Sequence, residues 1–285
     1  MRNEMIYPSE WDLTRPIYIE NSPFLFHYTT YSSALGILIS QQMRMGSLAN
    51  MNDPLEFENH RGDGLIFSGN PSNRYLAKKV FEFANAVAEK DRAVRLASFA
   101  VDGGNQKDYY NNLCKGWARS RMWAQYADNH KGVCLIFDKD KIIKTFKKEF
   151  KKPCKTYCNA VNYTNNLESL KEVLSSSCKS LLVSDKIDYL FQKCEDFEDE
   201  QEFRLLLINK KLKDSKEIVS FSIANSICGV ITGAKFPKEN ELTLQKAIKC
   251  CNTEIRRFYI SWHYGMPNVT DPEYHKLRVK EILGE

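Results

Sequence analysis

The sequence predicts a mixed α/β fold, because short apolar runs of strand length alternate with amphipathic helical segments along the chain. The clearest strand candidates are Phe24 to Tyr28, Val133 to Phe137 and Gln201 to Asn209. A chain of 285 residues can bury a sizeable core. Neither an internal repeat nor a clean linker interrupts it, so we expect a single domain over residues 1–285, with its core at about 24–262.

Composition is typical of a soluble protein, with 43% hydrophobic and 27% charged residues. No apolar run approaches the length of a membrane span, and the N-terminus lacks the apolar core of a signal peptide. We therefore expect a cytoplasmic protein without membrane contact. Nine scattered cysteines fit reduced thiols better than a disulfide framework. The formal charge of +5 permits an anionic partner without requiring one.

The first informative stretch begins with the strand candidate that carries His27. Ser32 or Ser33 can cap the helix that follows, and Arg44 to Ser47 can form a second short strand. A polar strand end that leads into a helix N-terminus can bind a phosphate-bearing ligand. The alternative is a helix packed on a sheet, with His27 as a satisfied core histidine.

The second informative stretch is a predicted helix, Arg119 to Asn129, followed by the strand from Val133. Trp123 and Tyr126 are three residues apart and so share one helix face. Two large aromatic side chains on one face usually belong to the core. The functional alternative is a stacking wall for a flat ligand ring.

The pattern of Lys139 to Lys155 predicts a basic amphipathic helix. Such a helix is usually a solvated surface, but it is also the best candidate in this chain for contact with nucleic-acid phosphates. The other predicted elements are helices at 75–90, 167–193, 238–251 and 271–283, strands at 94–101, 161–163, 218–223, 226–234 and 254–262, and a loop at 59–73.

The predicted strand that begins at Gln201 contains ionisable residues that could serve a functional site. A period of two places Glu200, Glu202 and Arg204 on one face. One interpretation is an exposed strand edge with a surface ion pair, which contributes little to stability. The other is a functional carboxylate that Arg204 helps to keep ionised.

Several other chemistries find little support. The sequence has no Gly-rich phosphate loop of the Walker or Rossmann kind and no nucleophile elbow. Cys154 and Cys158 lack a second Cys or His pair that would complete a zinc site, so we expect no metal. A Cys nucleophile with a distant His stays open. A histidine, an aromatic side chain and a glutamate together suit cleavage of an N-glycosidic bond.

Five motifs carry a family resemblance: FHYTT with SALGIL, MNDPLEFE, ASF, MWAQYADNHKGVCLIFD and DEQEFRLLL. In order and spacing, over about residues 24–233, they resemble a widespread bacterial family known only as a domain of unknown function. The first stretch is also similar to the start of the ADP-ribosyltransferase fold. The similarity is to the DNA-targeting ADP-ribosyltransferase toxins and the RNA 2′-phosphotransferases in particular.

This second resemblance implies a split, bent mixed sheet with surrounding helices that binds NAD as a substrate. Glu202 matches the catalytic glutamate of the late strand, and Glu200 matches the upstream member of a Glu-x-Glu pair. His27 matches a histidine that contacts ribose. The aromatic role against nicotinamide goes to Tyr126, with Trp123 and Tyr31 as alternatives. The remaining implied binding residues are Tyr28, Thr29, Ser98, Asn52 and Asp53. Asn52 and Asp53, together with Glu56, belong to the unknown-function family's own pattern.

The resemblance therefore implies an NAD-dependent ADP-ribosyltransferase, as a bacterial toxin or anti-phage effector that modifies RNA or DNA. A nucleic-acid acceptor would contact Lys139 to Lys155, and an antitoxin or inhibitor protein would be a further partner. The alternatives are an NAD glycohydrolase, a protein-directed ADP-ribosyltransferase, and a non-catalytic nucleotide- or nucleic-acid-binding module.

Overall fold

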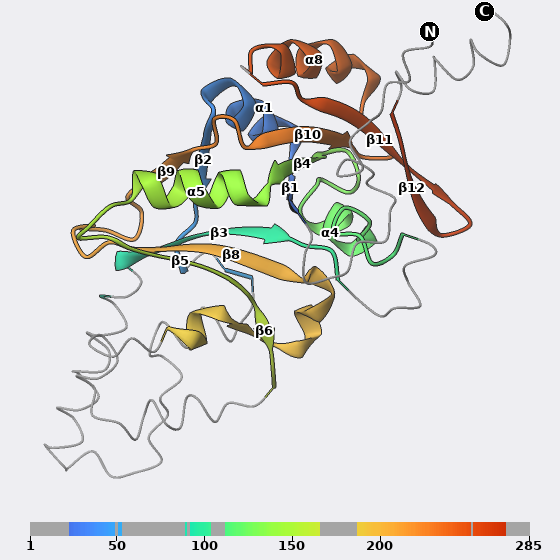
Figure 1. Ribbon diagram of the computed structural model, residues 1–285. Coiled ribbons are helices and arrows are strands. Elements are labelled where there is room, and N and C mark those ends of the chain that lie inside the picture. The colour runs from blue at the N-terminus through green and yellow to red at the C-terminus, as the bar shows by residue number, and fades with distance from the viewer. Residues whose placement is uncertain are drawn as a thin grey trace, which may run out of the picture. The chain divides into compact units, whose positions relative to one another are not determined.

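The computed structural model describes residues 23–48, 51–52, 89, 92–103, 112–165, 187–251 and 253–271. These residues form a mixed α/β fold with a large mixed sheet and few helices (Figure 1), which confirms the predicted fold class at this level. The chain divides into two compact units. Unit 1 draws on Met1–Gln42, Phe99–Thr145 and Ser222–Glu285, and unit 2 draws on Met43–Ser98 and Phe146–Phe221.

Unit 1 is built on neighbouring strands in the order β12-β11-β10-β4-β1. Strand β1 pairs antiparallel with β4 along its whole length, and β10 pairs parallel with β11. Five consecutive buried residues in β4 explain why this strand reads as an unbroken apolar run. The strands are β1 (Phe24–Thr29), β4 (Val133–Asp138), β10 (Ile227–Thr232), β11 (Arg256–His263) and β12 (Met266–Thr270).

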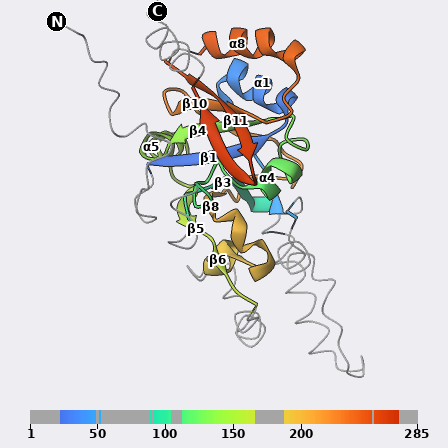
Figure 2. The same ribbon diagram turned by 90° about the vertical axis from the view of Figure 1, so that its right-hand side faces the viewer.

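The helices of unit 1 are α1 (Tyr31–Ser40), α4 (Ser120–Gln125) and α8 (Glu241–Lys249), the last preceded by the short η7 (Lys238–Asn240). Helices α1 and α8 lie side by side (Figure 2). The N-cap of α1 is Thr30, whose hydroxyl accepts a hydrogen bond from the Ser33 amide, so the predicted cap at Ser32 or Ser33 is wrong. Thr30 is preferred because its extended backbone joins β1 directly to the helix.

The predicted helix to Asn129 is also too long, because α4 ends at Gln125. Asp128, Asn129 and His130 all adopt left-handed backbone angles, which an α-helix of L-residues cannot continue. The His130 amide then donates to the Trp123 carbonyl, and the Gly132 amide donates to the Ala127 carbonyl. This turn leads the chain into β4, and both amides are hydrogen-bonded within it.

Gly132 lies where a side chain does not fit, since an added Cβ would be 2.4 Å from the carbonyl oxygen of Thr29. We expect Gly132→Ala to lower the free energy of unfolding by about 1–3 kcal/mol, because backbone atoms cannot yield easily. The matched control is Gly36→Ala in α1, where nothing lies within 4 Å of the added Cβ. We expect that change to stabilise the protein by up to about 1 kcal/mol. Equal urea midpoints for the two variants would contradict the prediction.

Unit 2 contains β3 (Val94–Ala100, through Ser98), β8 (Glu202–Ile208) and β5 (Lys155–Ala160), with β8 in the middle. Strands β5 and β8 are antiparallel in a register that pairs Lys155 with Ile208 and Ala160 with Phe203. Two short sheets complete the strands: β2 (Gln42–Met45) with β9 (Val219–Ser222), and β6 (Asn162–Tyr163) with β7 (Gln192–Lys193). A small apolar cluster that includes Leu96, Leu190, Phe191 and Leu206 forms its core.

Two further helix predictions are wrong within the described residues. Helix α5 (Lys139–Glu149) stops before Lys155, because the residue before Pro153 disfavours helical geometry, and β5 begins where helix was expected. Residues 188–193 form the short η5 (Asp188–Phe191) and β7, where the packing of Leu190 and Phe191 into the core overrides helical periodicity. The rest of that predicted helix, 167–186, lies outside the described residues. The predicted loop 59–73, the predicted helix 75–90 except residue 89, and the predicted tail helix 271–283 except residue 271 also lie outside them.

Candidate functional site

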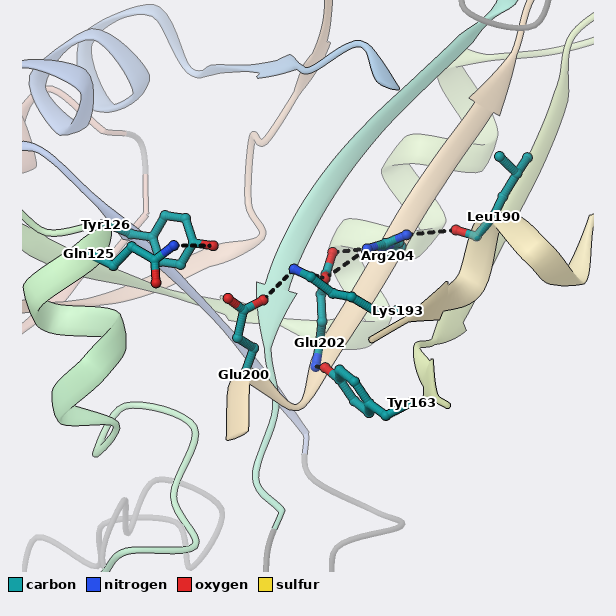
Figure 3. A network of polar contacts seen from close by, with 8 residues as sticks. All are labelled: Gln125, Tyr126, Tyr163, Leu190, Lys193, Glu200, Glu202 and Arg204. Carbon is teal, nitrogen blue, oxygen red and sulfur yellow. Dashed lines mark hydrogen bonds and ion pairs between the residues drawn. The ribbon is translucent and has the colours of Figure 1, made fainter. Parts of the chain in front are cut away.

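Four charged side chains of unit 2 form a buried network around the first residue of β8 (Figure 3). The Glu202 carboxylate accepts hydrogen bonds from Arg204 Nε at 2.7 Å and Nη2 at 2.9 Å. Lys193 Nζ lies 2.6 Å from Glu200 Oε2 and 3.4 Å from Glu202 Oε2. Each of these four residues is at most 5% exposed to solvent, so the alternative of an exposed surface ion pair is wrong.

Local backbone geometry explains how these residues meet. Glu202 and Arg204 are alternate residues of β8 and therefore share a face, as predicted. Glu200 is not on the strand, since it ends the short η6 (Glu195–Glu200). Gln201 then adopts a left-handed backbone angle of 42°, and the turn returns the Glu200 carboxylate to Lys193.

A second set of contacts fixes the Glu202 side chain and backbone. Ser98 of β3 forms a side-chain hydrogen bond with the Glu202 carboxylate. The Glu202 amide donates to the Tyr163 hydroxyl at 2.7 Å, and Arg204 Nη1 donates to the Leu190 carbonyl at 2.8 Å. Unit 2 thus brings together Ser98, Glu200 and Glu202, which were all predicted as site residues.

Sequence reasoning missed Lys193 and Tyr163. Lys193 lies in β7, inside the predicted helix, and its ammonium is 4.6 Å from the Phe197 ring centroid. Tyr163 was assigned only to a strand, and burial raises the pKa of its phenol so that the hydroxyl stays neutral. A lysine two residues after the apolar pair Leu190-Phe191 was the one available signal, and it is a weak one.

The electrostatics of the cluster favour an ionised Glu202. Burial alone raises the pKa of this carboxyl group, but the charges and hydrogen bonds of Arg204, Lys193 and Ser98 outweigh burial and lower the pKa to about 2. At neutral pH the side chain is a fixed anion with defined orientation. Such a group is a poor proton acceptor but can stabilise positive charge that develops next to it.

The candidates in unit 1 fall into two groups. His27 is half-buried in β1, with its ring centroid 5.7 Å from that of Phe99. Tyr28 and Thr29 are buried, and the Tyr28 hydroxyl donates to the Gly116 carbonyl at 2.7 Å. These two residues therefore belong to the packed part of the unit.

The aromatic candidates differ in exposure. Trp123 is fully buried in the core and donates from Nε1 to the Trp117 carbonyl, so it presents no surface to a ligand. Tyr126 caps the end of α4, is half-buried and hydrogen-bonds Gln125. Tyr31 is half-buried and packs edge-on against Phe236. Exposure therefore favours Tyr126 over Trp123 for stacking.

Three residues of the unknown-function family's pattern remain. Asn52 is exposed, and Asp53 and Glu56 lie outside the described residues. Within the described ranges, no group of three His, Cys, Asp or Glu side chains could hold a metal ion, and Cys154 and Cys158 are free thiols. In the same part of the chain, no helix has the length and apolar character needed to cross a membrane.

Comparison with known proteins gives one match. Neither a curated protein nor a solved structure matches the chain. A family model described as "Protein of unknown function (DUF2971)" matches residues 122–205, from α4 to the middle of β8. The matched segment contains Tyr126, Lys193 and the Glu200–Arg204 turn and strand. This match confirms the predicted resemblance to a domain family of unknown function over residues 122–205.

Proposed function

We propose that the protein is an NAD-dependent ADP-ribosyltransferase in which Glu202 stabilises the transition state. The observation that carries the proposal is the buried, ionised carboxylate of Glu202, which Arg204, Lys193 and Ser98 hold in place. Glu200 completes a Glu-x-Glu pair that shares the same lysine. The likeness of residues 24–58 to the start of the ADP-ribosyltransferase fold, with its split, bent sheet, supports this proposal.

In the proposed reaction, the bond between ribose C1′ and the nicotinamide nitrogen breaks, and nicotinamide leaves as a neutral molecule with the bonding electrons. The ribose becomes oxocarbenium-like, and an acceptor nucleophile forms a new bond to C1′ and loses its proton to solvent. With a pKa of about 2, Glu202 is suited to stabilise this cation and to bind the ribose 2′-hydroxyl. Its low basicity argues against a second role for this carboxylate, deprotonation of the acceptor.

Two further roles belong to the proposal. His27, half-buried on β1, would donate a hydrogen bond to a ribose hydroxyl, and Tyr126 would stack on nicotinamide. Both follow from the resemblance, and the partial exposure of both side chains is compatible with ligand contact.

The test is incubation of the full chain with NAD labelled in its adenylate half and a pool of RNA, single-stranded DNA and cell lysate. Nicotinamide release and label transfer are followed together. Label on one polymer class would support a transferase and identify its acceptor. Nicotinamide release without label would favour an NAD glycohydrolase instead. If the folded protein gives neither signal but NAD raises its melting temperature, the non-catalytic binding module is the better explanation.

A further inference from the structure

Unit 2 carries two exposed runs of lysines that are distant in sequence. The first run, residues 147–155, contains Lys147, Lys148, Lys151, Lys152 and Lys155. The second run, residues 210–216, follows β8 and contains Lys210, Lys211, Lys213 and Lys216. All nine lysines are exposed, and three acidic residues lie among or beside them. The whole chain has a formal charge of only +5, so positive charge is concentrated in these two runs.

Strand pairing places the two runs at one end of unit 2. Lys155 opens β5 and is the register partner of Ile208, the last residue of β8. The first run therefore ends beside the point where the second run begins, at the left of Figure 1. Lys147 is also close enough to β5 to influence the Cys158 thiol electrostatically. We call this surface, formed by residues 147–155 and 210–216, the lysine end.

The second run is held in a defined conformation by a buried arginine. Arg95 of β3 is 1% exposed, and its Nη2 donates to the Asp214 carbonyl at 2.8 Å and to the Glu217 carbonyl at 3.1 Å. The Asn209 amide donates to the Ala93 carbonyl, which fixes the start of the loop. Fixed attachment at both ends means that the loop backbone loses little entropy when these lysines contact a partner.

Two acidic side chains, one in the second run and one directly after it, form hydrogen bonds within the loop. Asp214 Oδ1 accepts from the Lys216 amide at 2.9 Å, and Glu217 Oε2 accepts from the Lys213 amide at 3.1 Å. The lysine ammonium groups project from a loop whose carboxylates are engaged by backbone N–H groups. The lysine end therefore presents mainly positive charge.

The chemistry of this surface indicates the class of partner. Lysine ammonium groups contact phosphates as point charges and do not read bases in the bidentate manner of arginine. Neither run has an exposed aromatic side chain on which single-stranded bases could stack. A surface with charge but without stacking groups should prefer the form of nucleic acid with the highest charge density, which is the duplex.

We propose that the lysine end binds the phosphate backbone of duplex DNA or RNA, independently of base sequence. This binding does not depend on the proposed NAD chemistry. It refines the sequence prediction of contact through Lys139–Lys155, because the second run comes from a segment that the prediction did not include. Glu202 is the first residue of the seven-residue strand β8, and the lysine end lies at the other end of that strand, six residue steps away. That is about 20 Å at the usual rise of a strand.

The test is fluorescence anisotropy of the full chain with labelled DNA duplexes and, separately, labelled RNA duplexes of about 20 base pairs. The titrations contain no NAD and cover about 50 to 200 mM salt. Neutralisation of about five phosphates would give a slope of about −4.5 in a log–log plot, or roughly a 500-fold decrease of affinity over this range. Lys210→Gln/Lys211→Gln/Lys213→Gln should reduce the steepness of the slope by about 0.9 for each phosphate that the variant no longer neutralises. We expect the same of Lys147→Gln/Lys148→Gln/Lys151→Gln, because both runs serve one site.

The matched control is Lys238→Gln/Lys246→Gln/Lys249→Gln, which removes the same charge from exposed positions of unit 1. We expect this control to keep both the affinity and the slope. No duplex binding at low salt, an equal decrease of affinity in all three triple variants, or tighter binding of a single strand than of the duplex would each overturn the proposal. So would binding of phosphatidylserine-rich vesicles through these lysines without binding of duplex. Each of these outcomes can be read whether or not the protein cleaves NAD.

Discussion

Glu202→Gln is expected to lower the turnover of NAD by at least about 10²- to 10³-fold, because it removes the fixed negative charge that faces the developing cation. The amide keeps the shape of the side chain and can still accept a hydrogen bond from Arg204 through its oxygen. We therefore expect the variant to fold, with lowered stability. The measurement is kcat for nicotinamide release per folded molecule, with the folded fraction taken from a melting curve.

Two controls separate catalysis from structure. Glu200→Gln removes the same charge from the same buried network and should cost a similar amount of stability. Since Glu200 belongs to the predicted binding residues, its replacement should raise KM for NAD and change kcat much less than Glu202→Gln does. Glu198→Gln changes an exposed glutamate of η6 and should leave both parameters unchanged. Full activity of Glu202→Gln would contradict the proposed mechanism. An equal decrease of kcat for Glu200→Gln and Glu202→Gln would indicate that the network has only a structural role.

The sequence predicts the central strands well because they are buried. The strand expected at Phe24–Tyr28 extends one residue further, to Thr29, and that expected at Val133–Phe137 extends to Asp138. Strand β5 has no such signal, since its six residues KTYCNA are half-buried or exposed. Its strand identity depends on pairing with β8, which is a tertiary interaction.

The candidate site was predictable in part for a similar reason. Alternation along one strand is local, so Glu202 and Arg204 could be placed on a common face from the sequence. The burial of these residues and the contribution of Lys193 depend on β7, on the turn at Gln201 and on Ser98 from another strand. The lysine end shows the same limit, because only the β5–β8 register brings its two runs together.

The second large effect concerns stability, and it is expected for Arg204→Met. This change leaves the buried Glu202 carboxylate without its two hydrogen bonds from Arg204 and the Leu190 carbonyl without the Arg204 donor. Removing one partner of a buried ion pair typically lowers the free energy of unfolding by about 3–5 kcal/mol. Arg44→Met, at an exposed position of β2, is the matched control and should change it by less than about 0.5 kcal/mol.

The pH dependence of this destabilisation distinguishes an ion-pair effect from a packing effect. In the native protein the pKa of Glu202 is about 2, below the ordinary value of 4.5, so its ionisation stabilises the fold above about pH 4.5. That contribution, roughly 3 kcal/mol, is lost as the pH falls toward 2. In Arg204→Met, burial is opposed by fewer positive charges, the pKa of Glu202 rises, and little of this contribution remains.

The stability difference between the two proteins, measured by urea denaturation, should therefore be largest at pH 7 and shrink as the pH falls below 4.5. The double variant Arg204→Met/Glu202→Met removes the uncompensated carboxylate and should recover part of the stability at pH 7. A difference that stays constant from about pH 7 to about pH 3, or a double variant less stable than Arg204→Met, would contradict the ion-pair explanation. Arg204 would then stabilise unit 2 through its packing and not through the charge of Glu202.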